Sequence, residues 1–138
     1  MPGARIGPAL ALAVAGLALS GCGGGGDETA ATETEATSTV TVPVGSMLQA
    51  SVGPGFEISL TTEDGEDVSL LAPGEYTIDV DDKSSSHNFH LTGPGVDEDS
   101  GVGEIGSSTW TVTFEPGTYE FACDPHSSSM NGDFEVTG

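Results

Sequence analysis

Positively charged side chains are almost absent from this sequence. Among its 138 residues only Arg5 and Lys83 are basic, against 22 aspartates and glutamates, so the formal net charge is −20. Nucleic-acid binding needs clustered Lys and Arg to pair with phosphates, and the composition therefore excludes that class of function. The acidic residues are spread along most of the chain. This distribution is compatible with adaptation to a salty medium, where charges are screened, and also with docking to a basic partner.

Long hydrophobic runs are also missing. The apolar run at residues 9–19 follows the single basic residue Arg5 and is too short to span a bilayer as a stable helix. It is typical of a secretory signal peptide, which we place at residues 1–21. The junction "LSGC" at residues 19–22 resembles a bacterial lipobox, in which the cysteine sulfur receives a diacylglycerol. We therefore expect a lipoprotein lipidated at Cys22 and anchored to the outer face of the cytoplasmic membrane; ordinary cleavage nearby is the alternative.

Cysteine is scarce, with only Cys22 and Cys123 in the chain. If Cys22 carries lipid, Cys123 has no disulfide partner within the chain. A lone thiol in an oxidising compartment needs another explanation. Burial as a small hydrophobic side chain is one, and metal ligation is the other.

Large apolar side chains are lacking between the leader and the first strand-like run. Residues 22–43 are rich in Gly, Thr, Glu and Ala and contain no large apolar side chain before Val40. Such a segment cannot bury a core and is predicted to be a disordered tether. The folded domain is then expected at residues 44–138.

The domain shows apolar and polar residues alternating with a period of two, in short runs separated by Gly, Pro, Asp and Ser. This pattern predicts an all-β sandwich, and no segment has the pattern of an amphipathic helix. The side chains predicted to face the core are Phe56, Ile58, Leu60, Tyr76, Ile78, Val80, Phe89, Trp110, Val112, Phe114, Tyr119, Phe121, Cys123, Phe134 and Val136.

Three potential metal donors lie close together near the C-terminus, in the order Cys123, His126 and Met130. One more donor is needed, and the remaining histidines are His87 and His90. If residues 87–92 form a strand, His87 shares a face with Phe89 and Leu91, whereas His90 lies on the opposite, polar face. We therefore predict that His87 is the fourth donor and that His90 is a surface residue.

Two imidazoles, one thiolate and a weak thioether are the donor set of a blue-copper site. Thiolate and thioether favour Cu(I), and imidazole serves both copper oxidation states. Zinc also suits Cys and His, but methionine is a poor zinc ligand. The alternative without a metal is a binding module with a buried cysteine and a solvated loop.

The segments "HNFHL" and "YEFACDPHSSSMNG" resemble the cupredoxins, in particular the small plastocyanin-like and azurin-like proteins of bacteria. The resemblance covers roughly residues 47–136. It implies a Greek-key β-sandwich of seven or eight strands that binds one type 1 copper ion. His87, Cys123 and His126 would be the equatorial ligands and Met130 the axial ligand, with His126 nearest the surface.

The resemblance also implies a role for the residue that follows the first ligand. Asn88 would tie the two ligand loops together by hydrogen bonds, with a partner near Cys123 and Asp124.

The leading functional hypothesis is an electron carrier that cycles between Cu(I) and Cu(II) and meets redox partner proteins outside the cytoplasm. The alternative is a copper carrier or buffer that delivers copper to an extracytoplasmic oxidase. Catalysis is not expected, because the copper enzymes of this family need additional centres with many more histidines and only His90 is left over. No Ser-His-Asp arrangement or phosphate-binding loop is recognisable.

Overall fold

The computed structural model describes residues 42–138. The predicted signal peptide, Cys22 and nearly all of the predicted tether lie outside the described residues. Val42, near the end of that tether, is buried and bridges Leu71, so the β-structure already includes residues just before Val44. Within the described part of the chain, no helix has the length and apolarity needed to cross a membrane.

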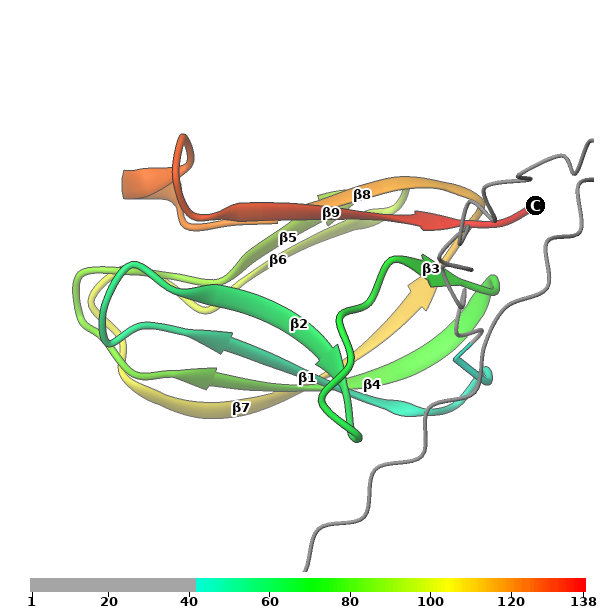
Figure 1. Cartoon of the computed structure of the whole chain (residues 1–138), viewed down its shortest axis with the longest axis horizontal. Helices are drawn as coiled ribbons and strands as arrows, with labels where there is room; N and C mark the ends of the chain where they lie inside the picture. Colours follow the sequence, from blue (N-terminus) through cyan, green and yellow to red (C-terminus); the bar gives the residue numbers. More distant parts are fainter. Residues whose placement is uncertain (1–41) are drawn as a thin grey trace, which may run out of the picture. The chain divides into compact units, whose positions relative to one another are not determined.

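In the described part of the chain, nine strands form two sheets that pack face to face (Figure 1). The all-β sandwich predicted from the alternation is confirmed, with nine strands in place of seven or eight. One sheet has the order β2-β1-β4-β7 and the other the order β3-β9-β8-β5-β6. The elements are β1 Met47–Val52, β2 Ile58–Thr62, β3 Leu70–Leu71, β4 Gly74–Asp82, β5 His90–Gly93, β6 Val96–Asp99, β7 Gly106–Phe114, β8 Gly117–Ala122, the 3-10 turn η1 Asp124–His126, and β9 Asn131–Val136.

The alternation of β4 shows how the sequence builds the core. Tyr76, Ile78 and Val80 are buried, while the residues between them are partly exposed. β4 pairs in parallel with β1 and antiparallel with β7, so both of its edges are hydrogen-bonded within the sheet. Its inward side chains pack in the core between the two sheets. Full burial of such side chains stabilises the fold by about 1.5–3 kcal/mol each.

A cluster of aromatic rings joins the two sheets. The ring of Phe114 on β7 lies edge-on to Tyr119 on β8 and Phe134 on β9, with centroids 4.8 and 5.4 Å away. The Tyr119 hydroxyl donates a hydrogen bond to the Pro94 carbonyl at 2.8 Å. Gly93 lies beneath the Tyr119 ring, because a Cβ atom there would be 2.2 Å from Cδ1 of that ring. The strand β8 runs from this buried cluster to Cys123.

Three connections meet at one end of the sandwich, the left end in Figure 1. They are the β1–β2 loop, the β4–β5 loop and the segment between β8 and β9 that contains η1. These connections come from distant parts of the sequence, and two of them carry the predicted metal ligands His87, Cys123, His126 and Met130.

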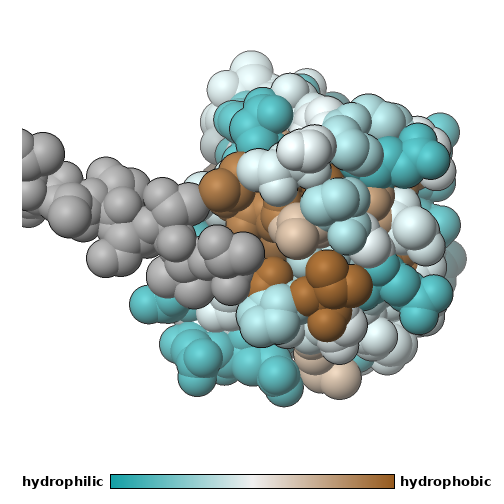
Figure 2. All heavy atoms as spheres, turned by 90° about the vertical axis from the view of Figure 1, so that its right-hand side faces the viewer, coloured by the Kyte–Doolittle hydropathy of each residue, from teal (hydrophilic) through white to brown (hydrophobic). Residues whose placement is uncertain are grey.

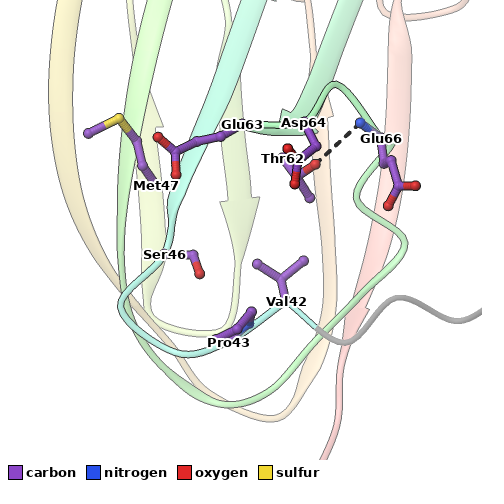
Figure 3. A pocket seen from close by; sticks show the side chains of 8 residues that line it. All are labelled: Val42, Pro43, Ser46, Met47, Thr62, Glu63, Asp64 and Glu66. Atoms are coloured by element: carbon purple, nitrogen blue, oxygen red, sulfur yellow. Dashed lines mark hydrogen bonds between the residues drawn. The ribbon is translucent and has the colours of Figure 1, made fainter.

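The other end of the molecule, near the C-terminus, carries a few apolar side chains among hydrophilic ones (Figure 2). A shallow cavity of about 120 Å³ lies at the end of β2 (Figure 3). Its lining includes Met47, Thr62 and three carboxylates, and none of the predicted metal ligands.

Candidate metal centre

Cys123 follows the last residue of β8 and is fully buried. Its N–H donates to the Met130 carbonyl at 2.9 Å, and its own carbonyl accepts the His126 N–H at 2.9 Å. The Met130 N–H in turn donates to the His126 carbonyl at 2.9 Å. These backbone hydrogen bonds therefore close the segment from Cys123 to Met130 into a compact loop.

His87 comes from the β4–β5 loop and is also buried, with 4% of its surface exposed. The strand predicted at residues 87–92 begins only at His90. His87, Asn88 and Phe89 are all buried, so alternation does not hold before the strand. His87 faces inward as predicted, but a loop places it there.

The structure brings three of the predicted ligands together. The Cys123 Sγ atom lies 3.5 Å from Nδ1 of His87 and 3.6 Å from Nδ1 of His126, and the two Nδ1 atoms are 3.1 Å apart. A circle through these three atoms has a radius of about 2.0 Å, close to the length of a metal–imidazole bond. The donors therefore surround a space that fits a single metal ion.

Met130 is fully buried at the end of the same loop and belongs to the core cluster that contains Cys123. Its backbone is paired with that of Cys123. A buried thioether beside a buried thiol gives the site two soft sulfur atoms, which copper accepts more readily than zinc does.

Asn88 joins the two loops. Its side-chain carbonyl accepts the Asp124 N–H at 2.8 Å, and its amide donates to Asp124 Oδ2 at 2.8 Å and to Asp99 Oδ1 at 2.7 Å. The amide is fully buried. It thus fixes the residue after Cys123 relative to the residue after His87.

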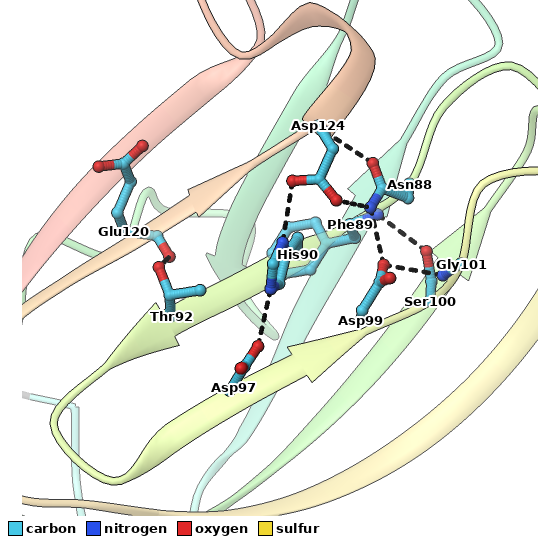
Figure 4. A network of polar contacts seen from close by, with 10 residues as sticks. All are labelled: Asn88, Phe89, His90, Thr92, Asp97, Asp99, Ser100, Gly101, Glu120 and Asp124. Carbon is cyan, nitrogen blue, oxygen red and sulfur yellow. Dashed lines mark hydrogen bonds and ion pairs between the residues drawn. The ribbon is translucent and has the colours of Figure 1, made fainter.

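His90 lies on the polar side of the sheet, as its parity predicts, and has two carboxylate partners (Figure 4). Its hydrogen bonds with Asp124 and Asp97 raise the pKa of the imidazole above its ordinary value. The same bond from His90, together with that from Asn88, lowers the pKa of Asp124. Both partners come from other elements of the fold, so no local pattern in the sequence predicts them.

Phe56 corrects a prediction. Its parity with Ile58 and Leu60 predicts a core position, but 68% of its surface is exposed. Its ring contacts both imidazoles edge-on, with centroids 5.5 Å from His87 and 5.0 Å from His126. The parity of β2 does not extend to Phe56, because the chain turns in the β1–β2 loop, where the Gly53 N–H donates to the Glu57 carbonyl.

The sandwich and its donor set define a cupredoxin, a β-sandwich protein with one copper centre. A model of the family "Copper binding proteins, plastocyanin/azurin family" matches residues 36–137. The chain belongs to this family, and copper is its cofactor.

Solved structures of rusticyanin share the fold. A variant of rusticyanin matches with a TM-score of 0.54 and 21% identity, over 72% of this chain and 82% of that one. Reduced rusticyanin matches with a TM-score of 0.51 and 20% identity, over 70% and 83%. At this identity the likeness establishes the fold alone.

Replacing Phe56 by alanine is expected to speed the loss of copper to a chelator. Phe56 makes two edge-on aromatic contacts with the imidazoles, each worth about 0.5–1.5 kcal/mol, so we expect copper release to be at least about fivefold faster, with little change in melting temperature. The measurement is the rate of copper transfer to a coloured chelator. Ile105→Ala, at an apolar residue that is 65% exposed, is the control. Equal rates in both variants and the wild type would show that the Phe56 ring does not shield the site.

Proposed function

We propose that this protein is a membrane-tethered, extracytoplasmic blue-copper electron carrier. The observation that carries the proposal is the convergence of His87 Nδ1, His126 Nδ1 and Cys123 Sγ, no two of which are more than 3.6 Å apart. We assign these residues as the equatorial ligands and Met130 as the axial one. Copper bound there would cycle between Cu(I) and Cu(II), taking up and releasing one electron.

Hydrogen bonds among the protein's own groups hold these donors in place. Backbone hydrogen bonds close the loop from Cys123 to Met130, and Asn88 ties that loop to the segment carrying His87. Sulfur donors favour Cu(I), and imidazoles serve both oxidation states. A set of sulfur and imidazole donors whose positions are held by the fold therefore moves little between Cu(I) and Cu(II). A small rearrangement keeps the barrier to electron transfer low.

The solvent exposure of the ligand side chains determines where a redox partner can come closest to the copper centre. Cys123 and Met130 are fully buried, whereas His126 is partly exposed. The exposed ring of Phe56 lies against His126. A redox partner would therefore approach the centre most closely at His126.

The alternative is a copper carrier or buffer, and the two sulfur donors suit it because they hold Cu(I) well. Kinetics separate the two functions. For an electron carrier, stopped-flow mixing with a soluble one-electron oxidant should show fast electron exchange, while transfer of Cu(I) to a competing chelator stays slow. Fast Cu(I) transfer combined with slow electron exchange would favour the copper carrier.

The membrane anchor rests on the sequence alone. The short apolar leader and the "LSGC" junction support lipidation of Cys22, which would place the domain on the outer face of the cytoplasmic membrane. A Cys22→Ser variant should then move from the membrane fraction to the soluble fraction while its copper centre remains intact, as judged by immunoblotting and absorption. Retention of the variant in the membrane would contradict the lipid anchor.

We place the partners among the redox proteins of an extracytoplasmic electron-transfer chain and assign no catalytic role. The acidic surface suits either a saline habitat or a basic partner. Electron exchange with a basic partner should slow as salt is added, because rising ionic strength screens the attraction.

A further inference from the structure

His90 links the loop that follows Cys123 to the edge of its own sheet. Its Nδ1 atom lies 2.9 Å from Asp124 Oδ1, and its Nε2 atom lies 2.8 Å from Asp97 Oδ1 on β6 (Figure 4). A neutral imidazole has one N–H donor and can donate to only one of these carboxylates. With a carboxylate at each nitrogen, the ring satisfies both only when it is protonated.

The carboxylate of Asp124 is held on two sides. His90 contacts Oδ1, and the buried Asn88 amide donates to Oδ2 at 2.8 Å. Asp124 is the first residue of η1, and the turn closes with the hydrogen bond from the His126 N–H to the Cys123 carbonyl. A restraint on the Asp124 side chain therefore acts on the backbone that places the Cys123 sulfur.

The charges around His90 come from two elements. Asp124 on η1 and Asp97 on β6 contact the ring, and Asp99 on β6 is paired with His90 in the sheet register. The β8 neighbour across the sheet is Ala122, which has no charge. Lys83 is the only lysine or arginine of the described residues, and its ammonium pairs with Asp81. When His90 is protonated, it is the cation that these carboxylates face.

We propose that His90 is a positioning residue of the copper centre, which fixes Asp124 and offsets the carboxylates beside the ligand loop. A positive charge near the centre favours the reduced, less positive form of the site and raises its reduction potential. Without the charge on His90, the carboxylates stabilise the oxidised form, and the potential falls. The inference rests on the copper site assigned above.

The reduction potential should also depend on whether His90 is protonated. The two carboxylate hydrogen bonds raise the pKa of its imidazole. The imidazole is therefore protonated at pH values below its ordinary pKa, and it keeps its charge at somewhat higher pH than a free histidine does. As pH rises through the raised pKa, the charge is lost, and the potential should fall.

The test is the reduction potential of the copper-loaded full chain, measured by spectroelectrochemistry for the wild type, His90→Gln and Thr92→Val. Thr92 lies on the same strand, next but one to His90, and makes only a long hydrogen bond of 3.5 Å to the Glu120 carbonyl. We expect a lower potential for His90→Gln and an unchanged potential for Thr92→Val. A potential for His90→Gln equal to that of the wild type, even with a lower melting temperature, would overturn the proposal.

A second measurement follows the reduction potential with pH, and its first arm uses the wild type alone. The wild-type potential should fall between acidic and mildly alkaline pH, and this fall should be absent in His90→Gln. A wild-type potential that is flat with pH would overturn the role of the charge. Absence of a copper–thiolate band in the wild type would instead refute the copper-site assignment, so the two failures are distinguishable.

Discussion

A Cys123→Ser variant is expected to lose the intense visible absorption of the copper protein and its reversible one-electron chemistry. The band requires a thiolate bound to copper, and a serine hydroxyl neither ionises near neutral pH nor offers a soft donor for Cu(I). Copper affinity should fall by more than about 100-fold, because loss of an outer partner of a metal ligand alone costs 10–100-fold. Spectroscopy and competition with a chelator measure both effects.

The fold should survive this substitution. Serine is no larger than cysteine, so the substitution introduces no steric clash at this fully buried position. Ser128→Ala, at an exposed residue of the same loop, is the matched control and should keep wild-type copper binding. A Cys123→Ser protein that binds copper tightly and keeps its midpoint potential would contradict the assignment of Cys123 as a ligand.

An Asn88→Ala variant is expected to lose both stability and copper affinity. The side chain is fully buried and makes three hydrogen bonds, one of which satisfies the Asp124 N–H. Its removal also leaves the Asp99 and Asp124 carboxylates without the amide that lies between them. We expect the free energy of unfolding to fall by about 2–4 kcal/mol and copper affinity to fall by about 10–100-fold.

Urea denaturation of the metal-free and copper-loaded forms measures the two effects separately. Asn131→Ala is the matched control, because Asn131 also caps the ligand loop through a bond to the Ser127 carbonyl but is exposed. We expect it to cost less than about 1 kcal/mol. If Asn88→Ala were as stable as Asn131→Ala and bound copper as tightly as the wild type, Asn88 would not tie the loops together.

The strands could be predicted because their cause is local. Tyr76, Ile78 and Val80 alternate with polar residues, and the sheet buries one face of β4 as that alternation requires. The same holds for Tyr119 and Phe121 on β8, which direct Cys123 inward. The two-residue strand β3 is too short to show a period.

The histidines show where periodicity stops being a guide. A strand over residues 87–92 predicts an inward-facing His87 and an exposed Asn88, yet His87 lies in a loop and Asn88 is buried. Burial there comes from packing of one loop on another. A Cβ atom on Gly53, for example, would lie 3.5 Å from Cδ2 of His87. Residues 34 positions apart in sequence leave no periodic signal of such a contact.

The roles of Phe56 and His90 could not be predicted from the sequence pattern. The parity of Phe56 with Ile58 and Leu60 indicated the core, but the chain turns before β2 and leaves the ring against His126. His90 was correctly placed on the polar face, but its partners Asp97 and Asp124 come from two other elements. Tertiary contacts of this kind become visible only once the loops are positioned in space.

The visible absorption spectrum of the protein loaded with one equivalent of Cu(II) tests the central claim most directly. If Cys123 and the imidazoles of His87 and His126 bind the same ion, with Met130 more distant, the spectrum contains an intense band from charge transfer between thiolate and copper, and reduction to Cu(I) bleaches it. A stoichiometric copper complex with only the weak absorption of nitrogen- and oxygen-ligated copper would contradict the account.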